Sequence, residues 1–281
     1  MKQLKKQMPR KDSIDTPISI KEIWAAFSGG HDSLVATHVI SVHPLFKGVI
    51  HLDTGIGIQE TQQYVIDICN QFGWDLSIYK ASAHVDSKGN FSPQVYEELI
   101  LRYGFPGPAM HGLFYNRLKE RLIRQFIRER KRTGDKPYLA ISTGFRASES
   151  ERRKKYKGQV FTQNGLPKSA VFAAPIIDWS EEDCQDYIKV HQLPKNPVVL
   201  KLCMSGECLC GAYAQKNELL AIEAHYPEVA KRIKELEKRV ARKFPWGWEG
   251  SPPDWWKEKR KKEKLESQGQ LNLFCHECSS L

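Results

Sequence analysis

The sequence contains no apolar run long enough to cross a membrane, which argues against an integral membrane protein. Residues 1–11 are basic but lack the apolar segment that a secretory signal peptide needs. We therefore expect a cytoplasmic protein with no membrane partner. The 281 residues, 41% of them hydrophobic and 27% charged, suffice for one α/β domain with an appendage.

Two familiar nucleotide-binding patterns are also missing, because neither G-x-x-x-x-G-K-[ST] nor G-x-G-x-x-G occurs. Instead, the apolar run 23–27 stops at a Gly-Gly segment, residues 28–33, and a helical pattern follows. Adjacent glycines let the backbone approach an anion closely, while serine hydroxyls and the first helical N–H groups offer donors to it. The predicted phosphate-binding residues are Ser28, Gly29, Gly30, His31, Asp32 and Ser33. The alternative is a plain turn in which Asp32 or Ser33 caps the helix.

Short apolar runs alternate with helical patterns along most of the chain. Strands are expected at residues 23–27, 48–52, 76–79, 138–142 and 171–175. Helices are expected at 33–42, 59–72, about 93–101, 116–131 and 180–191, the last one opened by a capping box of Ser180 and Asp183. This order predicts an α/β fold with a doubly wound, mostly parallel sheet that binds ligands at the carboxyl ends of its strands.

The composition divides the chain into three parts. We expect a basic leader at residues 1–18, a nucleotide-binding domain at 19–197 and a smaller helical appendage at 198–281 that contains cysteines. An amphipathic basic helix is expected at about 216–243 within the appendage. The small apolar content of this region favours a metal centre that closes it.

Two further segments place polar side chains after expected strands. Asp53 follows the second strand, where a carboxylate suits Mg²⁺ or a ribose hydroxyl, although Asp53-Thr54-Gly55 can also be a simple turn. Arg146 and Arg152 follow a later strand, and their planar guanidinium groups suit phosphate or sulfate oxygens. The alternative for this second segment is a solvated surface turn.

These segments resemble, in order, the motifs of one enzyme superfamily. Residues 28–33 are similar to the S-G-G-x-D-S loop of the PP-loop ATP pyrophosphatases, which split ATP between its α and β phosphates. Residues 53–61 resemble the D-T-G-x-x-x-x-E-T signature of the phosphoadenylylsulfate (PAPS) reductase superfamily, and residues 143–152 and 175–183 resemble two later motifs of it. The resemblance implies an adenine nucleotide α hydrolase-like fold. It adds Asp53, Thr54, Gly144 and Arg146 to the nucleotide-binding residues and implies Asp32, Asp53, Arg146 and Arg152 as catalytic residues.

The seven cysteines fall into two groups. Cys69 and Cys184 stand alone in apolar patterns and are expected in the core. The other five are the candidate metal ligands Cys203, Cys208, Cys210, Cys275 and Cys278. Clustered cysteines in a chain without an export signal bind metal more often than they form disulfides. We predict a [4Fe–4S] cluster on four of them, with Zn²⁺ as the alternative and unligated thiols as a third reading.

The same cysteines bear on the subtype within the superfamily. It includes sulfonucleotide reductases, the ATP-using subunit of sulfate adenylylation and the sulfur-activating proteins of DNA phosphorothioation. Reductases with a cluster resemble one another in an adjacent Cys-Cys pair, which is absent here. Reductases without a cluster end in E-C-G-L-H, of which this chain shares only Glu277-Cys278. The pattern favours the phosphorothioation proteins.

The formal net charge of +10 is concentrated in a few stretches. Residues 117–132 hold eight basic and two acidic side chains, and residues 231–264 hold thirteen basic and six acidic ones. This distribution favours a nucleic acid, DNA in the first place, as partner, although such runs are often solvated helix faces. Four tryptophans near the C-terminus either stack on bases or pack the appendage; they are Trp246, Trp248, Trp255 and Trp256.

The sequence thus predicts an ATP pyrophosphatase that uses Mg²⁺ to adenylylate a nucleic-acid backbone for sulfur incorporation. A cysteine desulfurase or another sulfur donor is the expected protein partner, and a homo-oligomer stays open. One alternative is a sulfonucleotide reductase with Cys278 as its nucleophile. Another is a nucleic-acid-binding subunit whose nucleotide site is regulatory.

Overall fold

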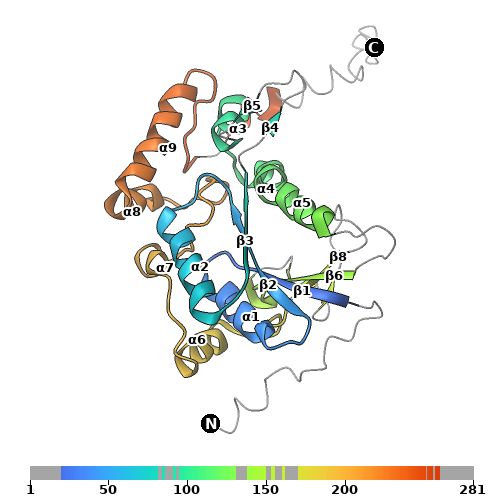
Figure 1. Cartoon of the computed structure of the whole chain (residues 1–281). Helices are drawn as coiled ribbons and strands as arrows, with labels where there is room; N and C mark the ends of the chain where they lie inside the picture. Colours follow the sequence, from blue (N-terminus) through green and yellow to red (C-terminus); the bar gives the residue numbers. More distant parts are fainter. Residues whose placement is uncertain are drawn as a thin grey trace, which may run out of the picture.

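A six-stranded sheet with the order β3-β2-β1-β6-β8-β7 forms the centre of the computed structural model (Figure 1). The structure describes residues 20–81, 84–85, 91–92, 95–130, 138–149, 153–155, 160–161, 170–250, 252–255 and 257–259. The strands of this sheet are β1 (Ile20–Ala26), β2 (Phe46–Asp53), β3 (Leu76–Lys80), β6 (Tyr138–Ser142), β7 (Val160–Phe161) and β8 (Ala170–Ala173). Only β7 runs antiparallel to its neighbour. A separate antiparallel pair consists of β4 (His84–Val85) and β5 (Phe91–Ser92).

The strand order confirms the predicted doubly wound α/β fold. From β1 the chain continues to β2 and β3 on one side, and it then returns to β6 on the other side of β1. The direction of winding therefore reverses between β1 and β6. In sheets of this kind, ligands bind in the crevice outside the carboxyl ends of the strands at this switch point.

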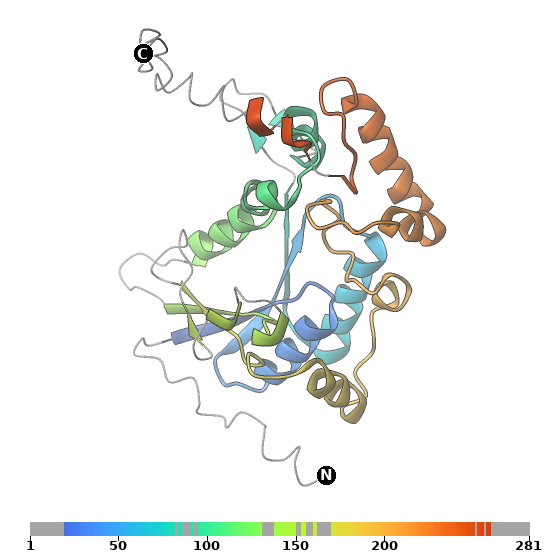
Figure 2. The same ribbon diagram turned by 180° about the vertical axis from the view of Figure 1, so that it is seen from behind.

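Helices cover both faces of the sheet, as the alternation of its side chains requires. On β1, Ile23 and Ala25 pack with α1 (His31–Ser41), α2 (Gln59–Phe72) and α6 (Glu181–Val190). Trp24 faces the other way and joins the core under the helices that cover the opposite face, which Figure 2 shows from behind. These are α3 (Val95–Tyr103), α4 (His111–Tyr115) and α5 (Arg121–Arg130), with a π-helical segment, Asn116–Glu120, between the last two. The 3₁₀ turns are Pro108–Met110, Ala147–Glu149 and Arg153–Lys155.

The C-terminal helices pack into the same core cluster as α3 and β2. They are α7 (Pro197–Leu202), α8 (Glu218–His225) and α9 (Pro227–Val240). Trp246 and Trp248 are buried there, and their indole N–H groups donate to the carbonyls of Phe105 and Leu209, each at 2.9 Å. This confirms the packing role for these two tryptophans and removes them from contact with nucleic acid. Trp255 is exposed, and Trp256 lies outside the described residues.

Most expected elements agree with the structure within a few residues, and the capping box of Ser180 and Asp183 is present. Two helices differ. The single helix expected at 216–243 is wrong, because the chain breaks between α8 and α9 at Tyr226 and Pro227. Proline lacks an N–H group and keeps the preceding residue out of the helical region. The helix expected at 116–131 begins earlier, at His111, and contains the π-helical segment.

Cys69 and Cys184 are buried in the core, as predicted. None of the helices in the described part of the chain is both long and apolar enough to cross a membrane. The predicted boundaries of the three parts stay predictions.

Candidate active site

The predicted phosphate loop connects the end of β1 to the start of α1. Gly30 is the N-cap of α1, and no side chain among the described residues caps this helix end. The Ser28 hydroxyl donates to the Ser33 hydroxyl at 3.0 Å, and the Ser33 hydroxyl donates to the Gly30 carbonyl at 2.9 Å. Asp32 lies in the first turn of the helix. The alternative in which Asp32 or Ser33 caps the helix is therefore wrong, and the positive end of the helix dipole is left open to an anion.

Gly29 takes a conformation that only glycine adopts easily, with φ at +80°. Its carbonyl accepts a hydrogen bond from the Asn196 side-chain amide at 2.9 Å, and a Cβ at this position would lie 2.7 Å from Cγ2 of Thr61. Asn196 is fully buried and also N-caps α7 through Val198. Asn196, which lies far from Gly29 in the sequence, thus holds the loop in this conformation.

The loop after β6 lies against the start of α1. A Cβ on Gly144 would lie 2.6 Å from the carbonyl carbon of Asp32 and 2.6 Å from the backbone nitrogen of Ser33. Arg146 is only 8% exposed, and its Nε lies 3.0 Å from Oδ2 of Asp32. The two polypeptide segments that meet at the switch point therefore bring together the predicted residues Asp32, Ser33, Gly144 and Arg146.

His31 adds a hydrogen-bond donor to the same place. Its Nδ1 lies 3.1 Å from the side-chain nitrogen of Gln185, which can only donate, so the ring proton belongs on Nε2. Burial, and then the charge of Lys195, lower the pKa of His31 and so favour the neutral ring. The Nε2 atom is buried and has no hydrogen-bond partner among the described residues. A buried donor without a partner at an open helix N-terminus fits a phosphate oxygen.

Asp53 lies at the carboxyl end of β2, as predicted. One carboxylate oxygen accepts from the backbone N–H of Gly55 at 2.9 Å, and the other lies 3.6 Å from Nζ of Lys80. The side chain is 17% exposed. Mg²⁺ is commonly held by one or two carboxylates together with substrate phosphates, and Asp53 fits that role.

The signature residues that follow Asp53 contact the C-terminal region. The Thr54 hydroxyl donates to the carbonyl of Glu207 at 2.9 Å, and the Thr61 hydroxyl donates to the carbonyl of Ser205. The backbone N–H of Ile58 donates to the carbonyl of Gly206 at 2.8 Å. The structure thus places Thr54, a predicted nucleotide-binding residue, in a fully buried contact with the segment that carries the cysteines.

Glu60 belongs to the same attachment. Its carboxylate lies 2.9 Å from Nζ of Lys201 and accepts a hydrogen bond from the Tyr226 hydroxyl. The hydrogen bond from Tyr226, and then the one from Lys201, lower the pKa of Glu60. This glutamate holds α7 and the start of α9 against α2.

Cys208 and Cys210 form a hydrogen-bonded thiol pair beside a buried ion pair. The hydrogen bond from Cys208 lowers the pKa of Cys210 to about 7, whereas the pKa of Cys208 is raised. Nζ of Lys119 lies 2.6 Å from a carboxylate oxygen of Glu207. Burial alone would lower the pKa of Lys119, but the charges of Glu207 and Cys208 raise it.

The described cysteines do not by themselves form a cluster site. Cys203 is exposed, and no group of three or more His, Cys, Asp or Glu side chains in the described part of the chain is placed to hold a metal ion. Cys275 and Cys278 lie outside the described residues. The predicted [4Fe–4S] or Zn²⁺ site therefore stays a prediction, and we assign it no chemical step.

The remaining predicted residues also include one that lies outside the described part of the chain. Arg152 lies outside the described residues, and the other predicted nucleotide-site residues lie around the carboxyl ends of β1, β2 and β6. The sequence patterns predicted no site role for Gln185, Lys119 or Glu207. Asn196 had a local signal, since Asn before Pro is typical of a helix N-cap, but its contact with Gly29 is long-range.

Several known proteins are similar to this chain in sequence. An uncharacterized protein of Methanocaldococcus jannaschii is 25% identical over 253 residues, which cover 87% of this chain and 55% of that protein. A phosphoadenosine 5'-phosphosulfate reductase of Vibrio vulnificus is 26% identical over 174 residues, which cover 61% of this chain and 59% of the reductase. The chain thus spans little more than half the length of these curated relatives.

Among solved structures, the U34-tRNA thiolase NcsA from Methanococcus maripaludis with its [4Fe-4S] cluster matches with a TM-score of 0.45 at 15% identity. The match covers 85% of this chain and 74% of the thiolase. Residues 22–208, from β1 to the thiol pair, match the family model of the phosphoadenosine phosphosulfate reductase domain. The chain belongs to the phosphoadenosine phosphosulfate reductase domain family.

Proposed function

We propose that this chain binds ATP at the phosphate loop and transfers its adenylyl group to a nucleic-acid backbone, so that sulfur can replace the activated oxygen. The observation that carries the proposal is the open N-terminus of α1, which lies against Gly144 and Arg146 at the switch point and carries the unpartnered Nε2 of His31. Membership in a family of nucleotide-using enzymes supports it.

The residues of the loop have distinct parts in this reaction. The first N–H groups of α1, the Ser28 and Ser33 hydroxyls and His31 bind the phosphates that leave as pyrophosphate. Asp53 would hold Mg²⁺, which would neutralise phosphate charge when bound. Arg146, oriented by its ion pair with Asp32, stabilises the negative charge that develops on the α-phosphate oxygens.

The proposed steps balance without an added oxidant. An oxygen of the nucleic-acid backbone attacks the α-phosphorus of ATP, the bond to the bridging oxygen breaks, and pyrophosphate leaves with the electron pair. A sulfur donor at the oxidation level of sulfide then takes the place of the adenylylated oxygen, which leaves as part of AMP. A desulfurase-type protein is the donor class that we propose: a second thiol attacks the inner sulfur of its cysteine persulfide, the two thiols form a disulfide, and the outer sulfur leaves at the oxidation level of sulfide.

Two features support nucleic acid and sulfur as the acceptor and the transferred atom. The net charge of +10 favours a polyanion. The Cys208 and Cys210 thiols lie in the loop that accepts the hydrogen bond from Thr54, so thiol chemistry and the nucleotide site are linked by direct contacts.

The test is release of pyrophosphate from ATP and Mg²⁺ in the presence of DNA or RNA oligonucleotides, with AMP as the second product. Ser33→Ala should lower kcat/KM by about 100-fold, because it removes a hydroxyl that can turn from the Gly30 carbonyl to donate to the phosphates. Ser41→Ala is the matched control: its hydroxyl also bonds the carbonyl three residues earlier, at 2.8 Å, but at the far end of α1. Release of orthophosphate and ADP, or an equal loss in both variants, contradicts the proposal.

A second candidate is reduction of a sulfonucleotide, which the name of the Vibrio vulnificus relative favours. A cysteine thiolate, Cys278 in this chain, would attack the sulfate sulfur and release the nucleotide, and a dithiol protein would then release sulfite. Sulfite release without ATP consumption, abolished by Cys278→Ser, would establish this reaction instead.

A further inference from the structure

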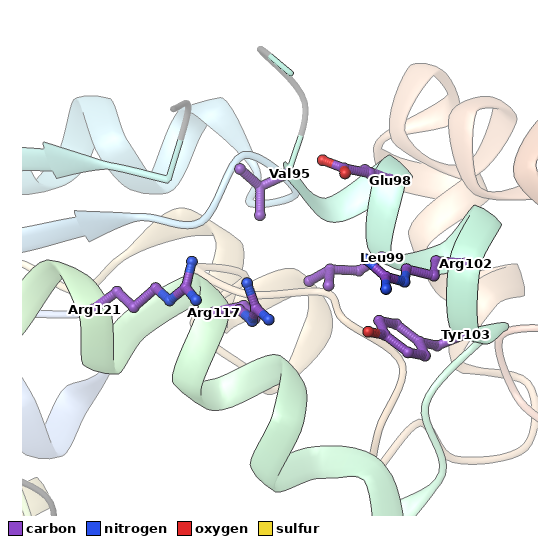
Figure 3. Close-up of a pocket in the computed structure, with 7 residues that line it drawn as sticks. All are labelled: Val95, Glu98, Leu99, Arg102, Tyr103, Arg117 and Arg121. Carbon is purple, nitrogen blue, oxygen red and sulfur yellow. The ribbon is translucent and has the colours of Figure 1, made fainter. Parts of the chain in front are cut away.

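A cleft lined by arginines opens between α3 and the helical run that contains the π-helical segment (Figure 3). It encloses about 310 Å³, including space open to solvent. The lining residues are Val95, Glu98, Leu99, Arg102, Tyr103, Arg117 and Arg121. None of them belongs to the site at the switch point.

Arg117 and Arg121 concentrate positive charge in this cleft. Figure 3 shows their guanidinium groups side by side, directed toward the space below Val95 and Glu98. Burial, and then the charges of Arg117 and Arg124, lower the pKa of Arg121. Arg124 has a carboxylate partner, Glu120, at 2.6 Å, whereas no ion pair joins Arg117 or Arg121 to a carboxylate within the part of the chain that the structure describes.

Glu98 gives the cleft a second kind of polar group. Its Oε2 atom is buried and has no hydrogen-bond partner among the described residues. A carboxylate in that position repels a bare anion but accepts a hydrogen bond from a sugar hydroxyl or a base N–H group. A ligand that carries both a phosphate and such a donor fits the cleft better than a free inorganic anion.

The cleft is connected to the nucleotide site through one short helical segment. Lys119 lies between Arg117 and Arg121 in the chain and reaches the other way, to Glu207. The carbonyl of Glu207 accepts the hydrogen bond from Thr54, next to Asp53. π-Helical turns are rare and occur frequently at functional sites. Here the π-helical segment directs Lys119 toward Glu207, in the loop that carries Cys208 and Cys210, and Arg117 into the cleft.

We propose that this cleft binds a phosphodiester of single-stranded nucleic acid, with Arg102, Arg117 and Arg121 on the phosphate and Glu98 accepting from the adjoining sugar or base. This inference rests on the proposed function, which supplies the reason to expect a nucleic acid in this cleft. The cleft itself is defined by the contacts above.

The test is fluorescence anisotropy of a labelled single-stranded oligonucleotide, measured with the full chain over a range of salt concentrations and without ATP. Each phosphate of a single strand that the protein neutralises adds about 0.7 to the slope of log Kd against log salt. Arg117→Gln with Arg121→Gln should therefore lower the slope by about 0.7 and weaken binding about 5-fold at about 0.1 M salt. Because the assay contains no ATP, it tests oligonucleotide binding at the cleft even if pyrophosphate release is never observed.

Two control variants separate the cleft from general charge and from misfolding. Lys47→Gln with Lys189→Gln removes the same two charges from exposed positions on β2 and α6, and it should leave Kd within about two-fold. Arg117→Lys with Arg121→Lys keeps both charges and should keep the wild-type slope. An equal loss of affinity in Lys47→Gln with Lys189→Gln would overturn the proposal. An unchanged slope in Arg117→Gln with Arg121→Gln, or displacement of the oligonucleotide by millimolar pyrophosphate, would overturn it too.

Discussion

Gly144→Ala tests whether the two loops at the switch point form the nucleotide site together. An ideal Cβ at this position lies 2.6 Å from backbone atoms of both Asp32 and Ser33, whereas ordinary contacts begin at 3.4 Å. One loop must therefore move by roughly 0.8 Å, and overpacking of this kind costs about 1–3 kcal/mol of stability. A displacement near 1 Å can reduce a rate about 100-fold, so we expect kcat/KM for pyrophosphate release to fall by about that factor.

Calorimetric binding of a non-hydrolysable ATP analogue measures the same change without chemistry. Gly112→Ala is the matched control, because an ideal Cβ there has no heavy atom of the described residues within 4 Å apart from its chain neighbours and the backbone of its own helix. In helix α4, alanine should be neutral or stabilise the fold by about 0.5–1 kcal/mol. Wild-type nucleotide affinity and turnover in Gly144→Ala would refute the idea that the start of α1 and the loop after β6 enclose the phosphates.

The loop that contains Glu207, Cys208 and Cys210 allows two more predictions. Lys119→Met leaves the buried Glu207 carboxylate without its partner and should lower the free energy of unfolding, measured in urea, by about 3 kcal/mol. Lys234→Met, which breaks an exposed ion pair of the same 2.6 Å length, should cost less than about 1 kcal/mol. Alkylation by iodoacetamide, followed by mass spectrometry, should reach half its maximum at Cys210 near its pKa of about 7, because the thiolate is lost below that pH. Cys69, whose pKa burial raises to about 12, should stay unmodified; no rise in Cys210 labelling between pH 6 and 8 would contradict the thiol-pair geometry.

Local patterns were sufficient for the sheet and for the glycine loop between β1 and α1. Strand residues such as Ile23 and Trp24 face opposite cores, and this shows in the sequence as a continuous apolar run that ends where the glycines begin. Gly144 and Arg146 follow a strand whose carboxyl end lies beside that loop, so topology alone brings them to it. The break before Pro227 had a readable signal, yet the helical periodicity on both sides hid it.

Contacts between distant segments had no such local signal. Asn196 contacts Gly29, and Lys119 contacts Glu207, although the residues of each pair lie far apart in the sequence. Nothing in the spacing of these residues indicates their partners. The π-helical segment is equally invisible in the sequence, because the buried residues Phe114, Leu118 and Leu122 keep a spacing of four that an uninterrupted α-helix also shows.

The residues of the D-T-G-x-x-x-x-E-T segment have different contacts in the structure. Only its first residue, Asp53, lies at the strand end with a carboxylate suited to a metal. The Thr54 hydroxyl donates to the carbonyl of Glu207, and the Thr61 hydroxyl donates to the carbonyl of Ser205. The Glu60 carboxylate contacts Lys201 and Tyr226. The motif therefore attaches the cysteine-bearing loop to the nucleotide site. A change at Thr54 or Glu60 should thus act on the placement of the thiols before it acts on ATP, which connects the energy source of the proposed reaction to its sulfur chemistry.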